Sequence, residues 1–351
     1  SFRWVCRCGL LAFLCLWFGF FALSYSARSF RPIAQCLCAC GAQFLSLVGV
    51  MFVLVIAYDL LLMFSFCELI TVLSCLLIGF ARTRLAARRS ALQALMVTTA
   101  GGLAMLVGLI MLGQSAGTYR ISAVLAQAPT LVSGPSGATV AAAVVLILTG
   151  AISKSALVPF HFWLPGAMAA PTPVSAYLHA AAMVKAGIYL VARLAPGFSD
   201  TTYWQSIVLG LGLATMLVGG YRALRQTDIK LILAYGTVSQ LGFLTMVAGL
   251  GTPDAALAGL AMLLAHGLFK ATLFLVVGII DQQAGTRDVR QLSGVFRQSR
   301  APGIVAGIGA ASMAGVPLLA GFGAQEDVVG AFVHHAADGG DWSLVVAVGM
   351  V

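Results

Sequence analysis

Charged side chains are scarce in this sequence. Only 9% of its 351 residues are Asp, Glu, Lys or Arg, against about 25% in ordinary soluble domains. Hydrophobic residues make up 60% of the chain, and its mean hydropathy is +1.00. So few charges cannot cover a soluble surface, and the composition therefore predicts an integral membrane protein. Because a spanning helix needs roughly 20 mostly apolar residues, the chain can supply on the order of ten spans.

The motifs of nucleotide, redox and metal chemistry are also missing. The sequence has no GxxxxGK[ST] phosphate loop, no dinucleotide GxGxxG, no HExxH and no CxxC. ATP hydrolysis, NADH oxidation and electron transfer by this chain have no support, so we expect neither a cofactor nor an enzymatic activity of the chain itself. The formal net charge of +9 does not indicate a nucleic-acid partner, because the basic residues form short clusters between apolar runs.

No cysteine follows residue 75, and a disulfide framework is typical of short secreted domains, not of such a chain. Cys36, Cys38 and Cys40 have the spacing CxCxC. On a helix, Cys36 and Cys40 share a face while Cys38 points away, so at most two of them can bind one metal ion. We interpret the cysteines as small apolar side chains and expect no metal site. The eight are Cys6, Cys8, Cys15, Cys36, Cys38, Cys40, Cys67 and Cys75.

The apolar runs predict an all-α, polytopic membrane protein with ten spans and the start of an eleventh. The runs are continuous and do not alternate in polarity, which favours helices over a membrane β-barrel. The longest connection, 113–138, is rich in small residues and is expected to be a surface loop. The predicted spans cover residues 9–27, 35–57, 59–81, 92–112, 139–160, 173–193, 203–220, 229–250, 255–280, 301–323 and 342 onward.

Basic residues in the predicted connections indicate the orientation. Thirteen Lys and Arg residues follow odd-numbered spans, with Lys230 counted among them, and four lie on the other side. Basic connections face the cytoplasm, so we expect the Arg-rich end to be cytoplasmic in a cell (plasma) membrane. The missing initial Met and the apolar run Trp342–Val351 indicate a piece of a longer chain.

Two spans contain proline where a membrane helix is expected to continue. Pro159 and Pro165 fall at the end of the fifth span, and Pro317 falls in the tenth. Proline removes a backbone donor and clashes with the preceding turn, so both helices are expected to be broken near mid-membrane. Broken helices five spans apart are typical of inverted-repeat transporters, although two incidental kinks would give the same pattern. The repeat interpretation divides the chain into a first helix with its flank, 1–34, and two five-helix repeats, 35–193 and 194–351.

Four ionisable side chains fall inside apolar spans: Glu68, Lys154, Lys185 and Lys270. Each charge at the bilayer centre costs at least about 2.5–3.5 kcal/mol, so these groups are expected to pair or to contact water. Burial favours the neutral form of an amine, which lets a buried lysine accept and release a proton near neutral pH. A neighbouring carboxylate has the opposite effect. We hypothesise that Glu68 switches the proton affinity of Lys154 by approaching it or moving away.

Two histidines extend this group. His266 precedes Lys270 by four residues, so the two lie on one face of the ninth span. His179 precedes Lys185 by six residues in the sixth span, and on a regular helix these two side chains point apart. The predicted proton pathway consists of Glu68, Lys154, His179, Lys185, His266 and Lys270.

The residues around this pathway resemble a known family. Residues 154–187 read KSALVPFHFWLPGAMAAPTPVSAYLHAAAMVKAG. This is similar to the core signature of the proton-conducting antiporter-like subunits that respiratory complex I and the Mrp cation/proton antiporters share. TDIKLILAYGTVSQ at 227–240 and HGLFK at 266–270 add to the likeness. The segments WLPGAM, MVKAG and GTRD are most similar to the A subunit of Mrp-type Na⁺/H⁺ antiporters.

The resemblance implies a proton-translocating subunit of a monovalent cation/proton antiporter. Na⁺ is the expected cation, and the implied partners are other membrane subunits of a hetero-oligomeric complex in the lipid bilayer. Glu68 matches the family's membrane glutamate, Lys154 its partner lysine, and His179, His266 and Lys270 its central relay. About two helices before residue 1 and a long segment after 351 are implied as well. Two other functions stay open: the proton-pumping arm of a complex I-like NADH–quinone oxidoreductase, and a scaffold subunit that has lost transport.

The chain departs from the family pattern at three positions. Gln325 in GFGAQ stands where the family usually has lysine, Cys67 where it usually has tryptophan, and Met262 where some members have histidine. Glutamine cannot hold a proton, so the first departure bears on a proton exit through the tenth span.

Overall fold

The computed structural model describes residues 2–29, 34–80, 84–180, 182–294 and 300–337. Within these ranges the regular structure is helical and no strand forms, which confirms the predicted all-α class. Eight segments of the described chain are long and apolar enough to cross a membrane, and one of them, Thr172–Phe198, combines α8 (Thr172–Ala180) and α9 (Met183–Phe198). The expected eleventh span from residue 342 and the side chains of Cys36 and Cys38 lie outside the described part.

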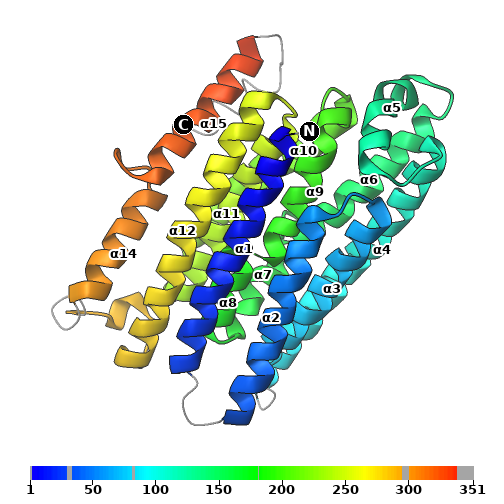
Figure 1. Ribbon diagram of the computed structural model, residues 1–351. Helices are drawn as coiled ribbons and strands as arrows, with labels where there is room; N and C mark the ends of the chain where they lie inside the picture. Colours follow the sequence, from blue (N-terminus) through cyan, green and yellow to red (C-terminus); the bar gives the residue numbers. More distant parts are fainter. Residues whose placement is uncertain (1, 30–33, 81–83, 181, 295–299, 338–351) are drawn as a thin grey trace.

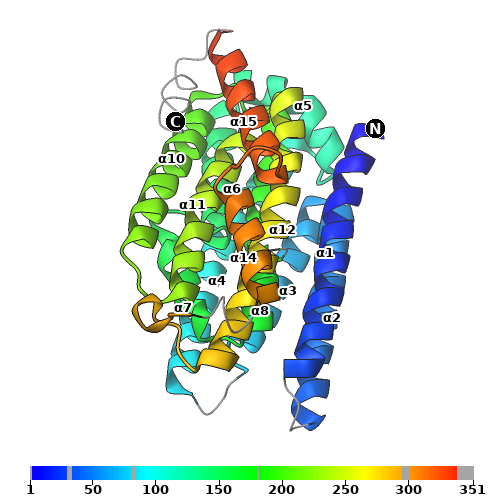
Figure 2. The same cartoon turned by 90° about the vertical axis from the view of Figure 1, so that its left-hand side faces the viewer.

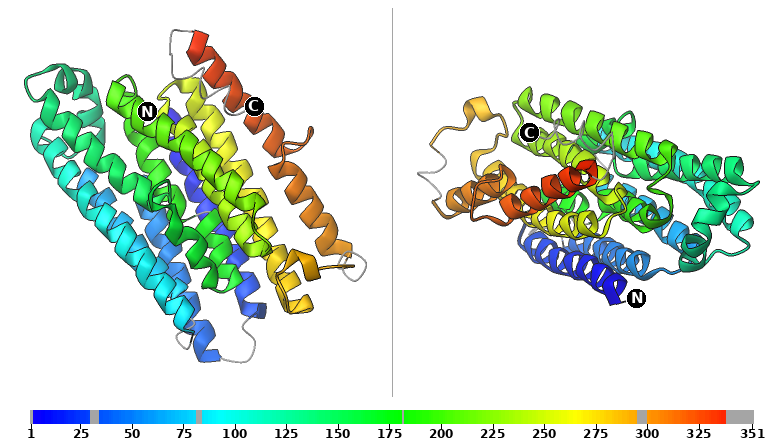
Figure 3. Two further views of the ribbon diagram at one scale, coloured as in Figure 1. Left: turned by 180° about the vertical axis from the view of Figure 1, so that it is seen from behind. Right: turned by 90° about the horizontal axis from the view of Figure 1, so that it is seen from above.

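The helices run side by side along one common direction (Figure 1). Viewed along that direction, α1 and α2 lie on the opposite side of the bundle from α10 (Figure 3, right). In a perpendicular view, α14 and α15 follow one another along α12 (Figure 2). The α-helices are α1 (Phe2–Ser29), α2 (Ala34–Ile56), α3 (Leu60–Ile78), α4 (Leu85–Ala116), α5 (Ile121–Ser133), α6 (Gly137–Lys154), α7 (Trp163–Gly166), α8 (Thr172–Ala180), α9 (Met183–Phe198), α10 (Thr202–Leu224), α11 (Ile229–Gly249), α12 (Pro253–Ala284), α14 (Arg300–Met313) and α15 (Ala320–Ala337); the 3₁₀ turns are η1 (Phe160–Phe162), η2 (Ala167–Ala169) and η3 (Val289–Gln291).

Two corners of the bundle have the same local structure. Asp59 caps the N-terminus of α3, and Asp228 caps that of α11, each accepting hydrogen bonds from two backbone N–H groups of the first turn. The helices α4 and α12 both end in a left-handed glycine, Gly117 and Gly285. After each glycine the chain returns to the aspartate and forms an isolated antiparallel bridge with it. The sequences that produce this turn are GTYRI at 117–121 and GTRDV at 285–289.

Replacing the capping aspartate of α11 is expected to destabilise this corner. Asp228→Ala leaves two N–H groups of the first turn without their acceptor, which costs about 0.5–2 kcal/mol of unfolding free energy. The check is thermal unfolding of the purified protein in detergent. Asp254→Ala is the control, because Asp254 lies in the first turn of α12 without being its cap. An unchanged Tm for Asp228→Ala beside an unchanged control would contradict the assigned role.

Both predicted helix breaks are present. The α6 helix ends at Lys154, and Ala156 then takes a positive φ of 52°. The α14 helix ends at Met313, and Gly315 takes a φ of 74°. Each reversal is closed by the same pattern of backbone hydrogen bonds to the preceding turn. The helices therefore end before the prolines, and Pro159 and Pro317 lie in the irregular segments that follow.

Pro165 does not interrupt a helix. It lies in α7, a single turn after the break, and proline is tolerated in a first turn because the N–H groups there need no partner within the helix. The indole Nε1 of Trp163 donates to the carbonyl oxygen of Ser153 at 3.0 Å. This bond ties the short helix back to the end of α6.

The prediction of a surface loop at 113–138 was wrong. Most of its middle forms α5, which packs Ile121, Val124, Ala128 and Leu131 into the core. These residues follow helical spacing, so one face of the segment is apolar. The loop prediction rested on the small residues Gly, Ala, Ser and Thr of 113–138, although the helix Ile121–Ser133 is itself apolar.

The predicted sixth span is interrupted. It divides into α8, which ends at Ala180, and α9, which begins at Met183. Ala182 has a non-helical backbone (φ −109°, ψ −100°), and its N–H bonds to the carbonyl of Tyr177, five residues back. The relation between His179 and Lys185 expected for a regular helix therefore does not apply.

Candidate functional site

The first part of the site is the contact between α3 and the end of α6. Lys154 is the last residue of α6 and is 1% exposed. Its Nζ lies 2.8 Å from Oε1 of Glu68 on α3. The same ammonium donates to the Thr71 hydroxyl at 2.5 Å and to the Cys67 carbonyl at 3.2 Å. The predicted Glu68–Lys154 pair is therefore formed. All three of these partners of Lys154 belong to α3.

A glycine makes room for the carboxylate of this pair. Gly102 on α4 lies opposite Glu68, and a Cβ at residue 102 would overlap the Glu68 carboxylate. Any larger side chain there would displace the carboxylate from its place beside Lys154. The close approach of α3 and α4 thus positions the glutamate.

Two further lysines are buried with one carbonyl partner each. Lys185 on α9 donates to the carbonyl of Leu263 at 3.1 Å, and Lys270 on α12 donates to that of Leu233 at 3.2 Å. Both residues are at most 1% exposed. An ammonium has three donors, so a single carbonyl leaves donors available for water or for a neighbouring side chain.

The break after α6 also connects the first pair to Lys185. Ser155, directly after Lys154, donates its hydroxyl to the carbonyl of Val184, directly before Lys185, at 3.0 Å. The end of α6 and the start of α9 are thereby held together. The two lysines stand on either side of this junction.

Two fully buried histidines stand among the lysines. His179 and His266 are both 0% exposed, and the ring nitrogens of each have no hydrogen-bond partner among the described residues. His266 interacts electrostatically with Lys185, Lys270 and His179. Buried polar atoms are nearly always hydrogen-bonded, so these imidazoles need water as their partner. Water at these positions would join the lysines into one polar row.

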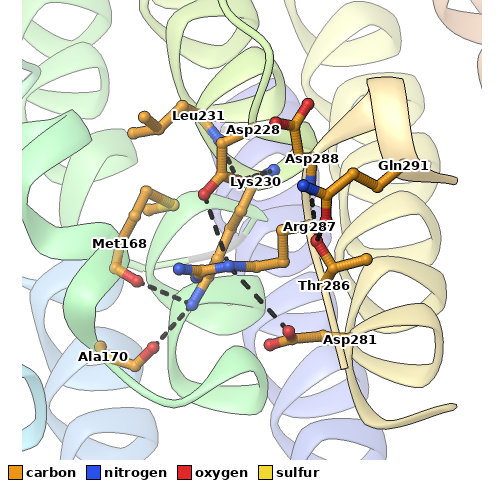
Figure 4. Close-up of polar contacts among 10 residues, drawn as sticks. All are labelled: Met168, Ala170, Asp228, Lys230, Leu231, Asp281, Thr286, Arg287, Asp288 and Gln291. Atoms are coloured by element: carbon orange, nitrogen blue, oxygen red, sulfur yellow. Dashed lines mark hydrogen bonds and ion pairs between the residues drawn. The ribbon is translucent and has the colours of Figure 1, made fainter. Parts of the chain in front are cut away.

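Sequence reasoning missed one member of the site. Lys230 was assigned to a basic connection, but it is 2% exposed in the first turn of α11. Its Nζ donates to the carbonyls of Met168 and Ala170 at 2.9 and 2.6 Å (Figure 4). The predicted span 229–250 already contained this lysine, and the capping Asp228 fixes the start of the helix before it, so the residue could have been grouped with the lysines inside spans.

Lys230 also lines a cavity of about 520 Å³ at the end of the bundle. Arg84, Asp281 and Arg287 share that lining. The Arg287 guanidinium lies between two carboxylates, with its Nε 3.4 Å from Asp228 and 4.0 Å from Asp281 (Figure 4). We refer to this polar cavity, from its rim at Arg287 to Lys230, as the vestibule.

The segment after the vestibule carries an exposed ion pair. Nη2 of Arg290 lies 2.6 Å from Oδ2 of Asp288. Hydrogen bonds from the Arg290 side chain, and then from its backbone N–H, lower the pKa of the Asp288 carboxyl. Asp288 thus stays ionised as the N-cap of η3.

The comparisons with known proteins agree with this geometry. The family model described as NADH:quinone oxidoreductase/Mrp antiporter, TM, matches residues 57–349. The chain belongs to this family. The match includes every member of the predicted pathway and both helix breaks.

Relatives within the family are antiporter subunits by name. The chain is 48% identical over 285 residues to a probable K⁺/H⁺ antiporter A/B subunit of Rhizobium meliloti, and the match covers 81% of this chain and 28% of that protein. It is 41% identical over 296 residues to the Na⁺/H⁺ antiporter A subunit of Alkalihalophilus pseudofirmus, covering 80% and 36%. The chain thus spans about a third of the length of these relatives.

A solved structure has the same fold. The Mrp complex from Dietzia sp. DQ12-45-1b contains a chain that superposes with a TM-score of 0.89 at 36% identity. The match covers 98% of this chain and 37% of that one. The helices described above are therefore arranged as in that chain of the Mrp complex.

The three departures from the family pattern occupy different environments. Cys67 and Met262 are buried, and Cys67 contributes its backbone carbonyl to Lys154. Gln325 on α15 donates its amide to the carbonyl of Met313 at 3.4 Å. It lies beside the second helix break, against Gly315.

Proposed function

We propose that this chain is the proton-translocating part of a monovalent cation/proton antiporter. The observation that carries the proposal is a row of ionisable residues that pair or interact electrostatically within a bundle of membrane-spanning length. It consists of the partly buried Glu68 and the buried Lys154, Lys185, His266, His179 and Lys270. Ionisable residues inside a membrane mark ion and proton pathways. The names of the relatives support this class of transporter.

In the proposed mechanism, lysines store the protons while histidines and water pass them on. Glu68 and Thr71 hold the ammonium of Lys154, so the protonated state is favoured while the pair is closed. When Glu68 withdraws, the buried ammonium loses its counter-charge and releases the proton toward Lys185. His266 and His179 then relay it to Lys270.

Protons are exchanged with the Arg-rich side through the vestibule. Lys230 lies at its inner end, and His179 interacts electrostatically with both Lys230 and Lys270. A proton taken up at Lys230 therefore has a short route to the central row. The ion pairs of Arg287 at the rim keep this end polar.

Removing the lysine of the vestibule is expected to slow transport. Lys230→Met keeps a similar length and loses the titratable amine, so proton exchange with the central row falls by about tenfold or more. The measurement is cation-dependent dissipation of a pH gradient in everted vesicles. Arg225→Gln is the matched control, an exposed basic residue at the same end of the bundle. A wild-type rate for Lys230→Met would show that protons do not pass through the vestibule.

The placement of the chain follows from the same proposal. The Arg-rich end, with Arg84, Arg287 and Arg290, faces the cytoplasm across a plasma membrane, and other membrane subunits complete the transporter. The matching corners at Asp59 and Asp228 and the matching breaks after α6 and α14 support two inverted repeats, 35–193 and 194–351, preceded by the helix of 1–34.

The experiment that tests the function is ion exchange in everted vesicles. The full-length protein is produced with its partner subunits in cells without their own antiporters, and Na⁺, K⁺ or Li⁺ is added after a pH gradient is formed. Dissipation by one of these cations is the expected result. If none dissipates the gradient and iron–sulfur or flavin subunits co-purify, the chain instead serves an oxidoreductase.

A further inference from the structure

A second polar cavity lies at the second helix break. It has a volume of about 720 Å³ and is lined by residues of α10, α11 and α15 and of the break before α15. None of the six residues of the predicted pathway lines it. The polar residues of its lining are Ser239, Gln240, Gln325, Glu326 and His334.

Two oxygens from α11 are available inside this cavity. The Oε1 of Gln240 is buried and has no hydrogen-bond partner among the described residues. The hydroxyl of Ser239 donates to the carbonyl of Met216 at 2.8 Å, so its lone pairs remain free to accept or to coordinate. A buried amide oxygen without a partner is costly unless a ligand or water satisfies it.

The amide oxygen of Gln325 is also available to a ligand. Its Nε2 donates to the Met313 carbonyl at the end of α14, which leaves Oε1 as the free end. That oxygen lies against Gly315, where a Cβ would overlap it. The C-terminal end of the half-helix α14 carries a partial negative charge, and such ends together with unwound backbone coordinate cations in transporters with broken helices.

The charged residues that line the cavity indicate which kind of ion it can bind. Glu326 is its one carboxylate, and no lysine or arginine occurs among the described residues that line it. Neutral oxygens with one negative charge suit a hard monovalent ion, since Ca²⁺ is held by more carboxylates and Mg²⁺ by carboxylates with phosphates. Glu326 is exposed, so its negative charge can attract a cation from outside into the cavity that it lines.

We propose that this cavity binds the monovalent metal cation that is exchanged for protons, with Gln240, Gln325 and Glu326 as its oxygen ligands. The inference rests on the proposed antiporter function and deepens it by separating the two ions. Protons follow the Lys and His row, and the cation binds between α11 and α15. In this arrangement a glutamine at position 325 supplies a cation ligand, whereas a lysine would repel the ion.

The test is equilibrium binding of radioactive sodium, and of radioactive rubidium as a potassium analogue, to the purified complex. Glu326→Gln and Gln325→Lys are each expected to weaken binding by about tenfold, because the first removes the attractive charge and the second adds a repulsive one. Asp327→Asn is the matched control: it removes a carboxylate from the next residue of α15, which does not line the cavity. Its affinity is expected to equal that of the wild type.

Two results would overturn the assignment: a wild-type complex that binds neither ion, or unchanged affinity in both cavity variants. The outcome is distinguishable from failure of the proposed function, because Lys154→Ala is expected to stop transport while leaving cation binding within about twofold of wild type. If Lys154→Ala transports normally, the proposed proton pathway is contradicted, whichever ion the cavity binds. If Lys154→Ala stops transport and the cavity variants bind normally, the row stands and the cation site lies elsewhere.

Discussion

Lys154→Ala is expected to reduce cation-dependent proton exchange by about a hundredfold or more, because the central proton carrier is lost. Lys154 is the one amine held by Glu68, Thr71 and the Cys67 carbonyl, so no neighbouring group replaces it. The measurement is pH-gradient dissipation in everted vesicles on addition of Na⁺ or K⁺. Assembly of each variant with its partner subunits is checked by size-exclusion chromatography in detergent.

A second variant separates proton exchange from the ion pair itself. Lys154→Arg keeps the positive charge and its partner Glu68, but a guanidinium does not release its proton in a protein. We therefore expect an assembled but inactive transporter. Normal transport by Lys154→Arg would show that the charge serves structure only, and normal transport by Lys154→Ala would leave a scaffold role for the chain.

The second large loss of transport is expected from substitution of a glycine, Gly102. Gly102→Ala places a Cβ where the Glu68 carboxylate lies, so the carboxylate moves away from Lys154 and transport falls by about tenfold or more. The matched control is Gly210→Ala on α10, where an added Cβ meets open space. Transport by this control is expected to equal that of the wild type.

Rescue makes this prediction specific. Glu68→Asp shortens the side chain by one methylene, which makes room for the new methyl group. The double variant Gly102→Ala with Glu68→Asp is therefore expected to transport faster than Gly102→Ala alone. Equal rates for Gly102→Ala and Gly210→Ala would mean that the position of the carboxylate does not limit the reaction.

Local patterns predicted much of the site. The long apolar runs predicted an all-α membrane protein, and the cost of a membrane charge singled out Glu68, Lys154, Lys185 and Lys270. All three lysines are buried, and Glu68 pairs with Lys154 as expected. The segments with Pro159 and Pro317 predicted broken helices because a missing donor and a steric clash act on the nearest turn.

The rest depends on contacts between distant segments. Lys230 was counted with the basic connection that contains Arg222 and Arg225. In the structure it is buried and donates to the carbonyls of Met168 and Ala170, about sixty residues earlier in the chain. No proline or glycine predicts the interruption between α8 and α9, because residues 179–183 are HAAAM. The role of Gly102 appears only when α3 is packed against α4.

The most direct test is a density map of the complete complex at a resolution that shows ordered water. We expect water molecules bonded to the imidazole nitrogens of His179 and His266 and continuous hydrogen-bonded links from Lys154 through Lys185 to Lys270. Dry surroundings for these imidazoles, or a row divided by apolar side chains, would contradict proton relay through this chain.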